Sequence, residues 1–269
     1  MPTLLITGAA GLVGTALRPL LRKDYRLRLL DRLPISDLAE NEEAVQAELT
    51  DPQAIDAAVA GVDAILHLAC AHGPGIAFNA TLGPNYEGTL YLLEAARKHG
   101  VRRFVFASSH HVLGQYRCDQ ASTFDDLPVA PDSYYAMSKV FGEAACASFA
   151  LRHNLAITVI RIGNADRKVA DARRLRIWIS ERDLAQLVWI GLTHPDIRYE
   201  VVYGVSESPN PLFSNNRART LGYCPQDHAQ DFLAANYQTY EEMDPYTSGR
   251  DFVGGAYAAT PFRSTLEVV

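Results

Sequence analysis

The sequence predicts an α/β protein: a Rossmann-type, doubly wound parallel sheet with a small C-terminal cap. Short apolar runs alternate with helical segments from the N-terminus to about residue 163, and the first of these runs ends at a glycine-rich turn. Alternating strands and helices are typical of a parallel sheet joined by right-handed crossovers. Beyond residue 163 this rhythm loosens. We therefore expect a Rossmann core at residues 1–163 and a smaller region at 164–269, interleaved with the core rather than independent.

The elements follow from apolar runs and from breaking residues. Five buried strands are expected at residues 3–7, 26–30, 64–68, 104–107 and 157–162. Helices are expected at 12–23, from Asp51-Pro52 to near Gly61, at 88–99 before Gly100, and at 135–153. A further helix at 181–194 and a strand at 200–203 lie in the C-terminal region, while 165–176 is polar and basic.

Composition excludes several classes of protein. The 269 residues are 48% hydrophobic and 21% charged, as in an ordinary globular domain. A net charge of −6 repels polyphosphate backbones, so we expect no nucleic-acid partner. No apolar run approaches the ~20 residues that span a bilayer, and the N-terminus has no secretion signal. Four scattered cysteines without a CxxC pair favour a reducing cytoplasm.

A glycine turn follows the first expected strand and opens a helix. It has the pattern GxxGxxG, formed by Gly8, Gly11 and Gly14. Glycines allow the backbone to approach a pyrophosphate closely, and the helix N-terminus stabilises its charge. Asp31 ends the second expected strand, where a carboxylate accepts hydrogen bonds from an adenosine ribose and repels a 2′-phosphate. The pattern predicts NAD rather than NADP, although the neighbouring Arg32 could hold a phosphate.

Tyr135 and Lys139 form a YxxxK pair on one face of a predicted helix. A phenol has a pKa near ~10 and is a poor base at neutral pH, but a nearby ammonium group favours the phenolate and lowers that pKa. The phenolate can then take a hydroxyl proton while a hydride leaves the same carbon. Ser109, which follows the fourth expected strand, could hold the substrate oxygen in line.

These motifs together resemble the extended short-chain dehydrogenase/reductases, the NAD-dependent epimerase/dehydratase family. The glycine turn, Asp31, Ser109 and YxxxK match in order, and Asn85 matches an asparagine that starts a helix in the middle of the site. The resemblance implies that Ser109, Tyr135, Lys139 and Asn85 are catalytic. It implies homo-oligomers and cofactor binding by the glycine turn and by residues near the strand ends. The expected cofactor-binding residues are Gly8, Gly11, Leu12, Val13, Gly14, Asp31, Arg32, Glu48, Leu49, Leu68, Ala69, Tyr135, Lys139 and Ile162.

Within this family the chain is most similar to uronate dehydrogenases, which oxidise galacturonate or glucuronate to an aldarolactone. The likeness rests on FVFASSHH, SYYAMSKVFGE, VIRIGN, WxS at 178–180 and the late FVGG at 252–255. It implies that Arg173 grips the substrate carboxylate, and a guanidinium fork suits a carboxylate. The sugar contacts implied are His72, Ser109, His110, His111, Asn164 and Arg173. Asparagine stands at the position of His110 in the subfamily, and serine stands at Asn164 and near His72.

Other interpretations remain open on the sequence. The basic run around Arg173 could instead be a solvated surface, or could suit a phosphate, so an aldose or sugar-phosphate dehydrogenase is the alternative substrate class. A non-catalytic dinucleotide-binding sensor is possible on the same fold. A serine hydrolase is disfavoured because no GxSxG elbow is present. We expect no metal, because the histidines lack HxH or HExxH spacing, and His67 fits a core histidine.

Overall fold

The computed structural model describes residues 1–119 and 127–263, and within them confirms the predicted doubly wound parallel sheet. Seven strands pair in the order β3-β2-β1-β4-β5-β6-β8, and every neighbouring pair is parallel. A separate two-stranded sheet pairs β7 with β9. The strands are β1 Thr3–Thr7, β2 Arg26–Asp31, β3 Glu42–Gln46, β4 Ala64–His67, β5 Arg103–Ser109, β6 Ala156–Ile162, β7 Val169–Asp171, β8 Tyr199–Gly204 and β9 Leu233–Gln238.

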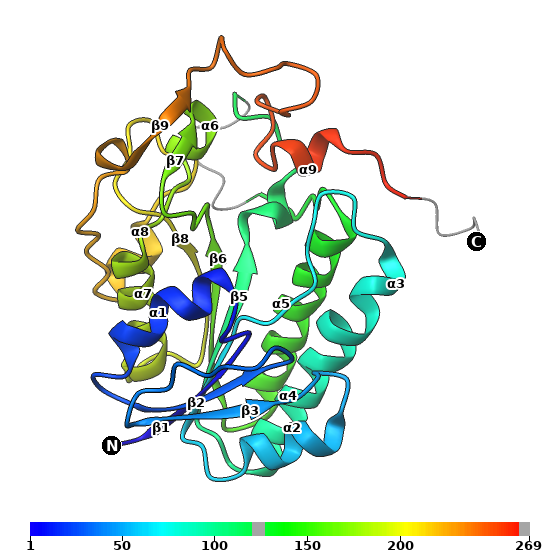
Figure 1. The fold of residues 1–269 in the computed structure, drawn as a ribbon, viewed down its shortest axis with the longest axis vertical. Coiled ribbons are helices and arrows are strands. Elements are labelled where there is room, and N and C mark those ends of the chain that lie inside the picture. Colours follow the sequence, from blue (N-terminus) through cyan, green and yellow to red (C-terminus); the bar gives the residue numbers. More distant parts are fainter. Residues whose placement is uncertain (120–126, 264–269) are drawn as a thin grey trace.

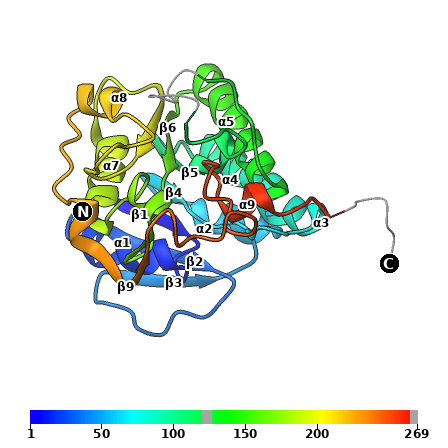
Figure 2. The same cartoon turned by 90° about the horizontal axis from the view of Figure 1, so that it is seen from above.

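Helices cover both faces of the main sheet (Figures 1 and 2). α1 and α7 pack on one face, and α2, α4 and α5 pack on the other. Alternation along β1 shows why the strands are apolar throughout: Leu4 and Ile6 join one core, whereas Leu5 joins the other. The helices are α1 Leu12–Leu21, α2 Pro52–Val59, α3 Phe78–Thr81, α4 Gly88–Lys98, α5 Tyr134–Arg152, α6 Ala172–Leu175, α7 Glu181–Thr193, α8 Asn216–Thr220 and α9 Ala256–Ala259.

Helix starts and stops follow the local sequence. Asp51 caps α2 by accepting hydrogen bonds from the N–H groups of Gln53 and Ala54, which confirms the helix predicted to open at Asp51-Pro52. Ser133 caps α5 through the N–H of Ala136. Gly100 follows α4 with φ +70°, a conformation that favours glycine.

Three strands were not predicted. β3 is an edge strand whose Glu43 and Ala44 are exposed, so it lacks an apolar run, and it makes the strand at Ala64–His67 the fourth of the sheet rather than the third. β7 lies within the polar stretch 165–176, and β9 lies in the region where no strand was expected. These strands were missed because β7 has only three residues and because β3 and β9 are largely exposed, so none of them has an apolar run or a clear alternation.

The C-terminal region contributes both to the Rossmann core and to the cap above it. α7 and β8 lie beyond residue 163 but belong to the main sheet and its covering helices. β7, β9, α6 and α9 lie above the sheet at the end toward which β5 and β6 point (Figure 1). Within residues 1–119 and 127–263, no helix is both long and apolar enough to cross a membrane. The cap therefore sits over the carboxyl ends of the strands, where parallel sheets hold ligands.

Candidate active site

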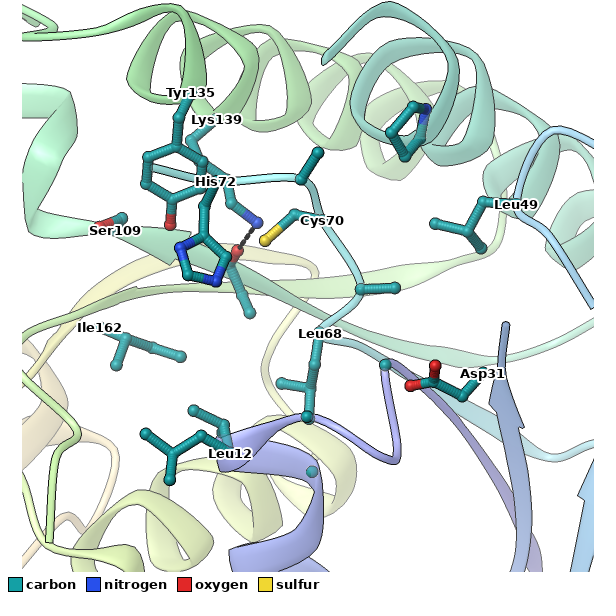
Figure 3. Close-up of a pocket in the computed structure, with 18 of the residues that line it drawn as sticks. Leu12, Asp31, Leu49, Leu68, Cys70, His72, Ser109, Tyr135, Lys139 and Ile162 are labelled. Atoms are coloured by element: carbon teal, nitrogen blue, oxygen red, sulfur yellow. Dashed lines mark hydrogen bonds between the residues drawn. The ribbon is translucent and has the colours of Figure 1, made fainter. Parts of the chain in front are cut away.

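A cavity of about 670 Å³ opens at the carboxyl ends of the strands, where the order of the sheet reverses at β1 (Figure 3). Gly8 follows β1, Asp31 ends β2, Leu68 follows β4 and Ser109 ends β5. Such a reversal leaves a crevice between the connecting loops, and ligands of open α/β sheets bind there. All residues predicted to hold the cofactor line it: Gly8, Gly11, Leu12, Val13, Gly14, Asp31, Arg32, Glu48, Leu49, Leu68, Ala69, Tyr135, Lys139 and Ile162.

The glycine turn fits a dinucleotide pyrophosphate. Gly8 has φ +72°, and a Cβ there would lie 2.6 Å from the backbone nitrogen of Ala69. A Cβ on Gly14 would lie 2.4 Å from the carbonyl oxygen of Gly8. No side chain caps α1 at Gly11, so the N–H groups of its first turn are left for an anion. The turn therefore requires glycine and offers a cradle of N–H donors.

Asp31 is held in a fixed orientation at the other end of the cavity. Its two carboxylate oxygens accept hydrogen bonds from the backbone N–H groups of Ala10 and Leu33, each at 3.0 Å. Each oxygen keeps a further lone pair, so the carboxylate can still accept the two hydroxyls of a ribose. Leu49 is buried beside it, whereas Arg32 and Glu48 are exposed at the rim. These contacts suit the adenosine half of NAD.

Tyr135 and Lys139 lie one turn apart near the start of α5. The Lys139 ammonium donates to the carbonyl oxygen of Ala107 at 2.6 Å and lies 5.6 Å from the centre of the Tyr135 ring. Burial raises the pKa of Tyr135 well above its usual range, whereas the neighbouring Ser109 hydroxyl lowers it. A lowered pKa was the expectation from YxxxK. In the protein alone, desolvation outweighs the Ser109 hydroxyl.

Ser109 and His72 lie with Tyr135 at one end of the cavity, and Asp31 and Leu49 lie toward the other (Figure 3). The Ser109 oxygen accepts a hydrogen bond from the backbone N–H of His111 at 3.3 Å, which fixes the hydroxyl beside the phenol. The imidazole of His72 lies 3.4 Å from the Tyr257 hydroxyl. A substrate oxygen placed between Ser109 and Tyr135 would meet both hydroxyl groups.

Asn85 lies outside the cavity lining, in a π-helical turn at Leu82–Glu87. Its side chain donates to the carbonyl oxygen of Ala71 at 2.9 Å and to the Ser138 hydroxyl at 2.8 Å, and accepts from the N–H of Ala71 at 2.7 Å. These bonds engage both the nitrogen and the oxygen of the Asn85 amide. Asn85 was predicted among the catalytic residues, but its position is that of a residue that fixes the loop after β4 against α5.

Arg173, on α6, is a buried cation without an ion-pair partner among residues 1–119 and 127–263. Its guanidinium donates to the carbonyl oxygen of Val253 at 2.9 Å, while its Nε has no hydrogen-bond partner. Burial lowers its pKa, because the charge is desolvated. The neighbouring Arg174 is already paired with Asp171 at 2.6 Å. A buried, uncompensated guanidinium is costly, and an anionic ligand would offset that cost.

The remaining predicted sugar contacts lie beside the cavity rather than in its lining. His110 and His111 are buried in a 3₁₀ turn at His110–Leu113, directly after β5. Asn164 turns its amide toward Asp166, donating at 3.1 Å. His110, His111 and Arg173 come together beneath the C-terminal segment, whereas Asn164 does not join them through any hydrogen bond of the described residues.

Two residues of this region were missed by sequence reasoning. Tyr257, on α9, stacks on His111 with ring centres 4.1 Å apart. Asp132 is buried with its carboxylate 2.7 Å from the imidazole of His111. Neither lies at the end of an expected strand, so no local pattern marked them in the sequence. Their proximity to the site depends on the path of the cap.

Two interpretations set aside earlier are also disfavoured by geometry. Ser109 accepts from the backbone of His111, but no imidazole nitrogen of the described residues bonds to its hydroxyl, as a hydrolase would need. His67 bonds through both ring nitrogens to Thr7 and Thr89 within the core, which confirms it as a satisfied core histidine. No group of three or more metal-binding side chains occurs in residues 1–119 and 127–263.

Comparison with known proteins agrees with this geometry. Residues 4–165 match the model of the NAD dependent epimerase/dehydratase family. The chain is 40% identical over 267 residues to a uronate dehydrogenase of Pseudomonas putida, covering 96% of this chain and 97% of that protein. It is 34% identical over 249 residues to an NAD-dependent glucose-6-phosphate dehydrogenase of Haloferax volcanii, covering 85% and 94%. A mutant uronate dehydrogenase of Agrobacterium tumefaciens in complex with NAD superposes with a TM-score of 0.90 at 33% identity, covering 98% and 100%.

Proposed function

The chain belongs to the NAD dependent epimerase/dehydratase family and is an NAD-dependent sugar dehydrogenase, and we propose that its substrate is a free hexuronate. Galacturonate or glucuronate would be oxidised at the anomeric carbon to an aldarolactone. The observation that carries the substrate class is the buried guanidinium of Arg173, which has no ion-pair partner among the described residues. A carboxylate would meet that charge bidentately.

The chemistry at the anomeric carbon needs one hydride acceptor and one base. When bound, NAD would supply the hydride acceptor. Tyr135 takes the proton of the anomeric hydroxyl, and the carbon becomes the lactone carbonyl. The Lys139 ammonium, 5.6 Å from the ring centre, favours the phenolate that accepts this proton. Ser109 holds the substrate oxygen beside Tyr135.

A phosphorylated sugar is the second candidate, because a glucose-6-phosphate dehydrogenase is among the relatives. Helix α6 offers one buried guanidinium without an ion-pair partner among the described residues, that of Arg173, because Arg174 is paired with Asp171. A phosphate dianion calls for more than one free cation. A non-catalytic sensor is disfavoured, because Ser109, Tyr135 and Lys139 are gathered at one end of the cavity.

The test is a panel of galacturonate, glucuronate, galactose, glucose and glucose 6-phosphate with NAD, followed by NADH absorbance. Arg173→Met removes a charge worth about 2–5 kcal/mol to a buried ion pair, so the KM for uronates should rise steeply. The KM for neutral aldoses should change little. Arg174→Met is the matched control, because that guanidinium is already paired. Wild-type protein that ignores both uronates but oxidises another sugar would refute the uronate assignment.

A further inference from the structure

We propose that Asp132 is a positioning residue that fixes the tautomer of His111, so that this histidine meets the sugar as a hydrogen-bond acceptor. The identity of the ligand as a sugar hydroxyl rests on the function proposed above. The tautomer does not, because it follows from contacts within the protein. Asp132 lies at the end of the loop before α5, and His111 lies in the 3₁₀ turn after β5.

The carboxylate of Asp132 has a defined partner on each oxygen. Oδ2 lies 2.7 Å from Nδ1 of His111, and Oδ1 accepts the hydroxyl of Ser133 at 2.8 Å. An ionised carboxylate can only accept hydrogen bonds. Nδ1 of His111 must therefore carry the proton, and Nε2 must be the unprotonated nitrogen of a neutral ring. The pKa of His111 is lowered to about 3 by burial, which keeps the ring neutral.

Ser133 cannot reverse this arrangement, because an ionised carboxylate has no proton to give, so the Ser133 hydroxyl donates to Asp132. The Ser133 oxygen also accepts the N–H of Ala136 at 3.1 Å and so caps α5. A chain of hydrogen bonds thus runs from the first turn of α5, which carries Tyr135, through Ser133 and Asp132 to His111. The backbone N–H of His111 in turn donates to Ser109 at 3.3 Å. Asp132 links the two elements that carry Ser109 and Tyr135.

The surrounding backbone leaves room for this carboxylate. A Cβ on Gly114 would lie 1.8 Å from Oδ2 of Asp132, and one on Gly254 would lie 1.9 Å from it. These glycines come from different parts of the chain and are joined by a hydrogen bond from Gly254 to the carbonyl oxygen of Gly114 at 3.0 Å. Each of these two segments therefore places a glycine directly against the Asp132 carboxylate, which is tightly enclosed between them.

The other ring nitrogen of His111 is available to a ligand. In residues 1–119 and 127–263, no hydrogen-bond partner meets its Nε2. Its ring packs edge-on against that of Tyr135, with centres 5.8 Å apart. His110 has the same tautomer, protonated at Nδ1. Its Nδ1 lies 3.1 Å from the carbonyl oxygen of Ile162, which can only accept a hydrogen bond, and its buried Nε2 has no partner. The Nε2 acceptor of His111 lies near the guanidinium of Arg173, and this pair suits a sugar with both hydroxyl and carboxylate groups.

Asp132→Asn is the informative change, because it keeps the shape and reverses the polarity. The Ser133 proton would hold the amide oxygen, which turns the amide N–H₂ toward Nδ1 of His111. Nδ1 must then accept, and the proton moves to Nε2. We expect ¹⁵N NMR of the wild-type protein to show His111 protonated at Nδ1. The Asp132→Asn variant should show it protonated at Nε2.

The protein contains an internal reference of opposite tautomer. The Thr89 hydroxyl donates to the carbonyl oxygen of Asn85 at 2.7 Å, so it must accept from Nε2 of His67 at 3.1 Å. His67 should therefore be protonated at Nε2 in both proteins and should not respond to the substitution. Ser133→Ala is the matched control variant. This variant removes the hydrogen bond that caps the N-terminus of α5, and so lowers stability. It leaves the Asp132 carboxylate in place, and with it the His111 tautomer.

The kinetic expectation for Asp132→Asn is a loss in kcat/KM toward the sugar of roughly 10- to 100-fold, the effect of one misdirected buried hydrogen bond. NAD affinity should be unchanged. A wild-type His111 protonated at Nε2, or the same tautomer in wild type and Asp132→Asn, would overturn the inference. If the tautomers are as expected but neither uronate is oxidised, the proposed substrate fails while the role of Asp132 stands.

Discussion

The ammonium of Lys139 lies between the ring of Tyr135, 5.6 Å from its centre, and the carbonyl oxygen of Ala107, 2.6 Å away. The carbonyl anchors the cation at the end of β5, so it cannot swing away from the phenol. Burial raises the pKa of Tyr135 and the Ser109 hydroxyl lowers it. We expect the ammonium to favour the charged phenolate as well, because opposite charges attract. The first prediction concerns the phenol itself.

Tyr135→Phe keeps the ring but removes the oxygen that exchanges the proton. Turnover should fall by roughly 10²–10⁴, the usual contribution of a positioned acid–base group. NAD affinity should barely change, because the glycine turn and Asp31 are untouched. Steady-state NADH formation together with a cofactor-binding titration measures both quantities.

Tyr134→Phe is the control for that experiment. Tyr134 is the preceding residue, but its ring packs on Phe78 with centres 5.5 Å apart, and its hydroxyl donates to the carbonyl oxygen of Arg263. It does not line the cavity. Its turnover should stay near the wild-type value. Near-normal turnover in Tyr135→Phe would rule out the phenol as the base.

The second prediction is that Asp31 sets the preference for NAD over NADP. Asp31→Ala removes the carboxylate that faces the ribose and should narrow the preference for NAD over NADP by roughly 10- to 100-fold, the effect of a charged hydrogen bond. The ratio of kcat/KM for the two cofactors measures this. Arg32→Ala tests the neighbour, and should weaken only NADP if that guanidinium holds a phosphate. Wild-type turnover with NADP that equals or exceeds turnover with NAD would contradict the role of Asp31.

The main sheet and the cofactor half of the site were predictable because their signals are local. Each central strand is buried on both faces and so reads as a continuous apolar run, and each ligand-facing residue comes at or just after the end of such a run. Asp31 and Ser109 could be placed for that reason. The edge strand β3 was missed because its exposed glutamates interrupt the apolar pattern.

The substrate half was less predictable because it is assembled by distant segments. Gly254 contacts Asp132 and Gly114, each more than one hundred residues away in the sequence. Val253 contacts Arg173, which is about eighty residues away. No periodicity marks such contacts in advance. Arg173 was identified through a resemblance, but the sequence could not distinguish a buried cation from a solvated one. Whether Arg173 is buried depends on how the C-terminal segments pack around it.

Asp132 should reduce stability at neutral pH. Burial raises the pKa of its carboxyl to about 6, whereas an unfolded aspartate titrates near ~3.9. Between these two pKa values the folded state binds more protons than the unfolded state. The contribution of the protonated Asp132 carboxyl to the free energy of unfolding is therefore complete below the unfolded pKa, and it is lost as the pH rises through about 6. Asparagine does not titrate. The stability of Asp132→Asn relative to wild type should therefore increase by about 2 kcal/mol from pH 4 to pH 7.

Urea unfolding of both proteins at several pH values measures that difference. The groups around Asp132 include Ser133, His110, His111, Arg173, Tyr135 and Tyr257. Burial lowers the pKa values of the two histidines, which gives the opposite pH slope. Because burial is the largest cause for both histidines, most of that slope is common to the two proteins. A relative stability that is flat from pH 4 to pH 7 would show that the carboxyl titrates normally.

The last prediction concerns the support of Arg173 by the C-terminal segment. Gly255 has φ +58°, and a Cβ there would lie 2.6 Å from Cζ of Arg173. Gly255→Ala therefore combines backbone strain with a collision against the guanidinium. Stability should fall by more than the roughly 1–2 kcal/mol that the strained backbone costs alone. The KM for a uronate should rise while the KM for a neutral aldose stays close to the wild-type value.

Gly100→Ala separates the two causes. Gly100 has φ +70° but no atom within 4 Å of a Cβ, and it lies between α4 and the start of β5, at the opposite end of the strands from the α6 helix that carries Arg173. That variant should show the backbone cost alone, measured by urea unfolding, with uronate kinetics unchanged. If Gly255→Ala loses no more stability than Gly100→Ala and binds uronate normally, the guanidinium is not held where the structure places it. A selective rise in uronate KM for Gly255→Ala alone would support a carboxylate-binding Arg173 positioned by the backbone it packs on.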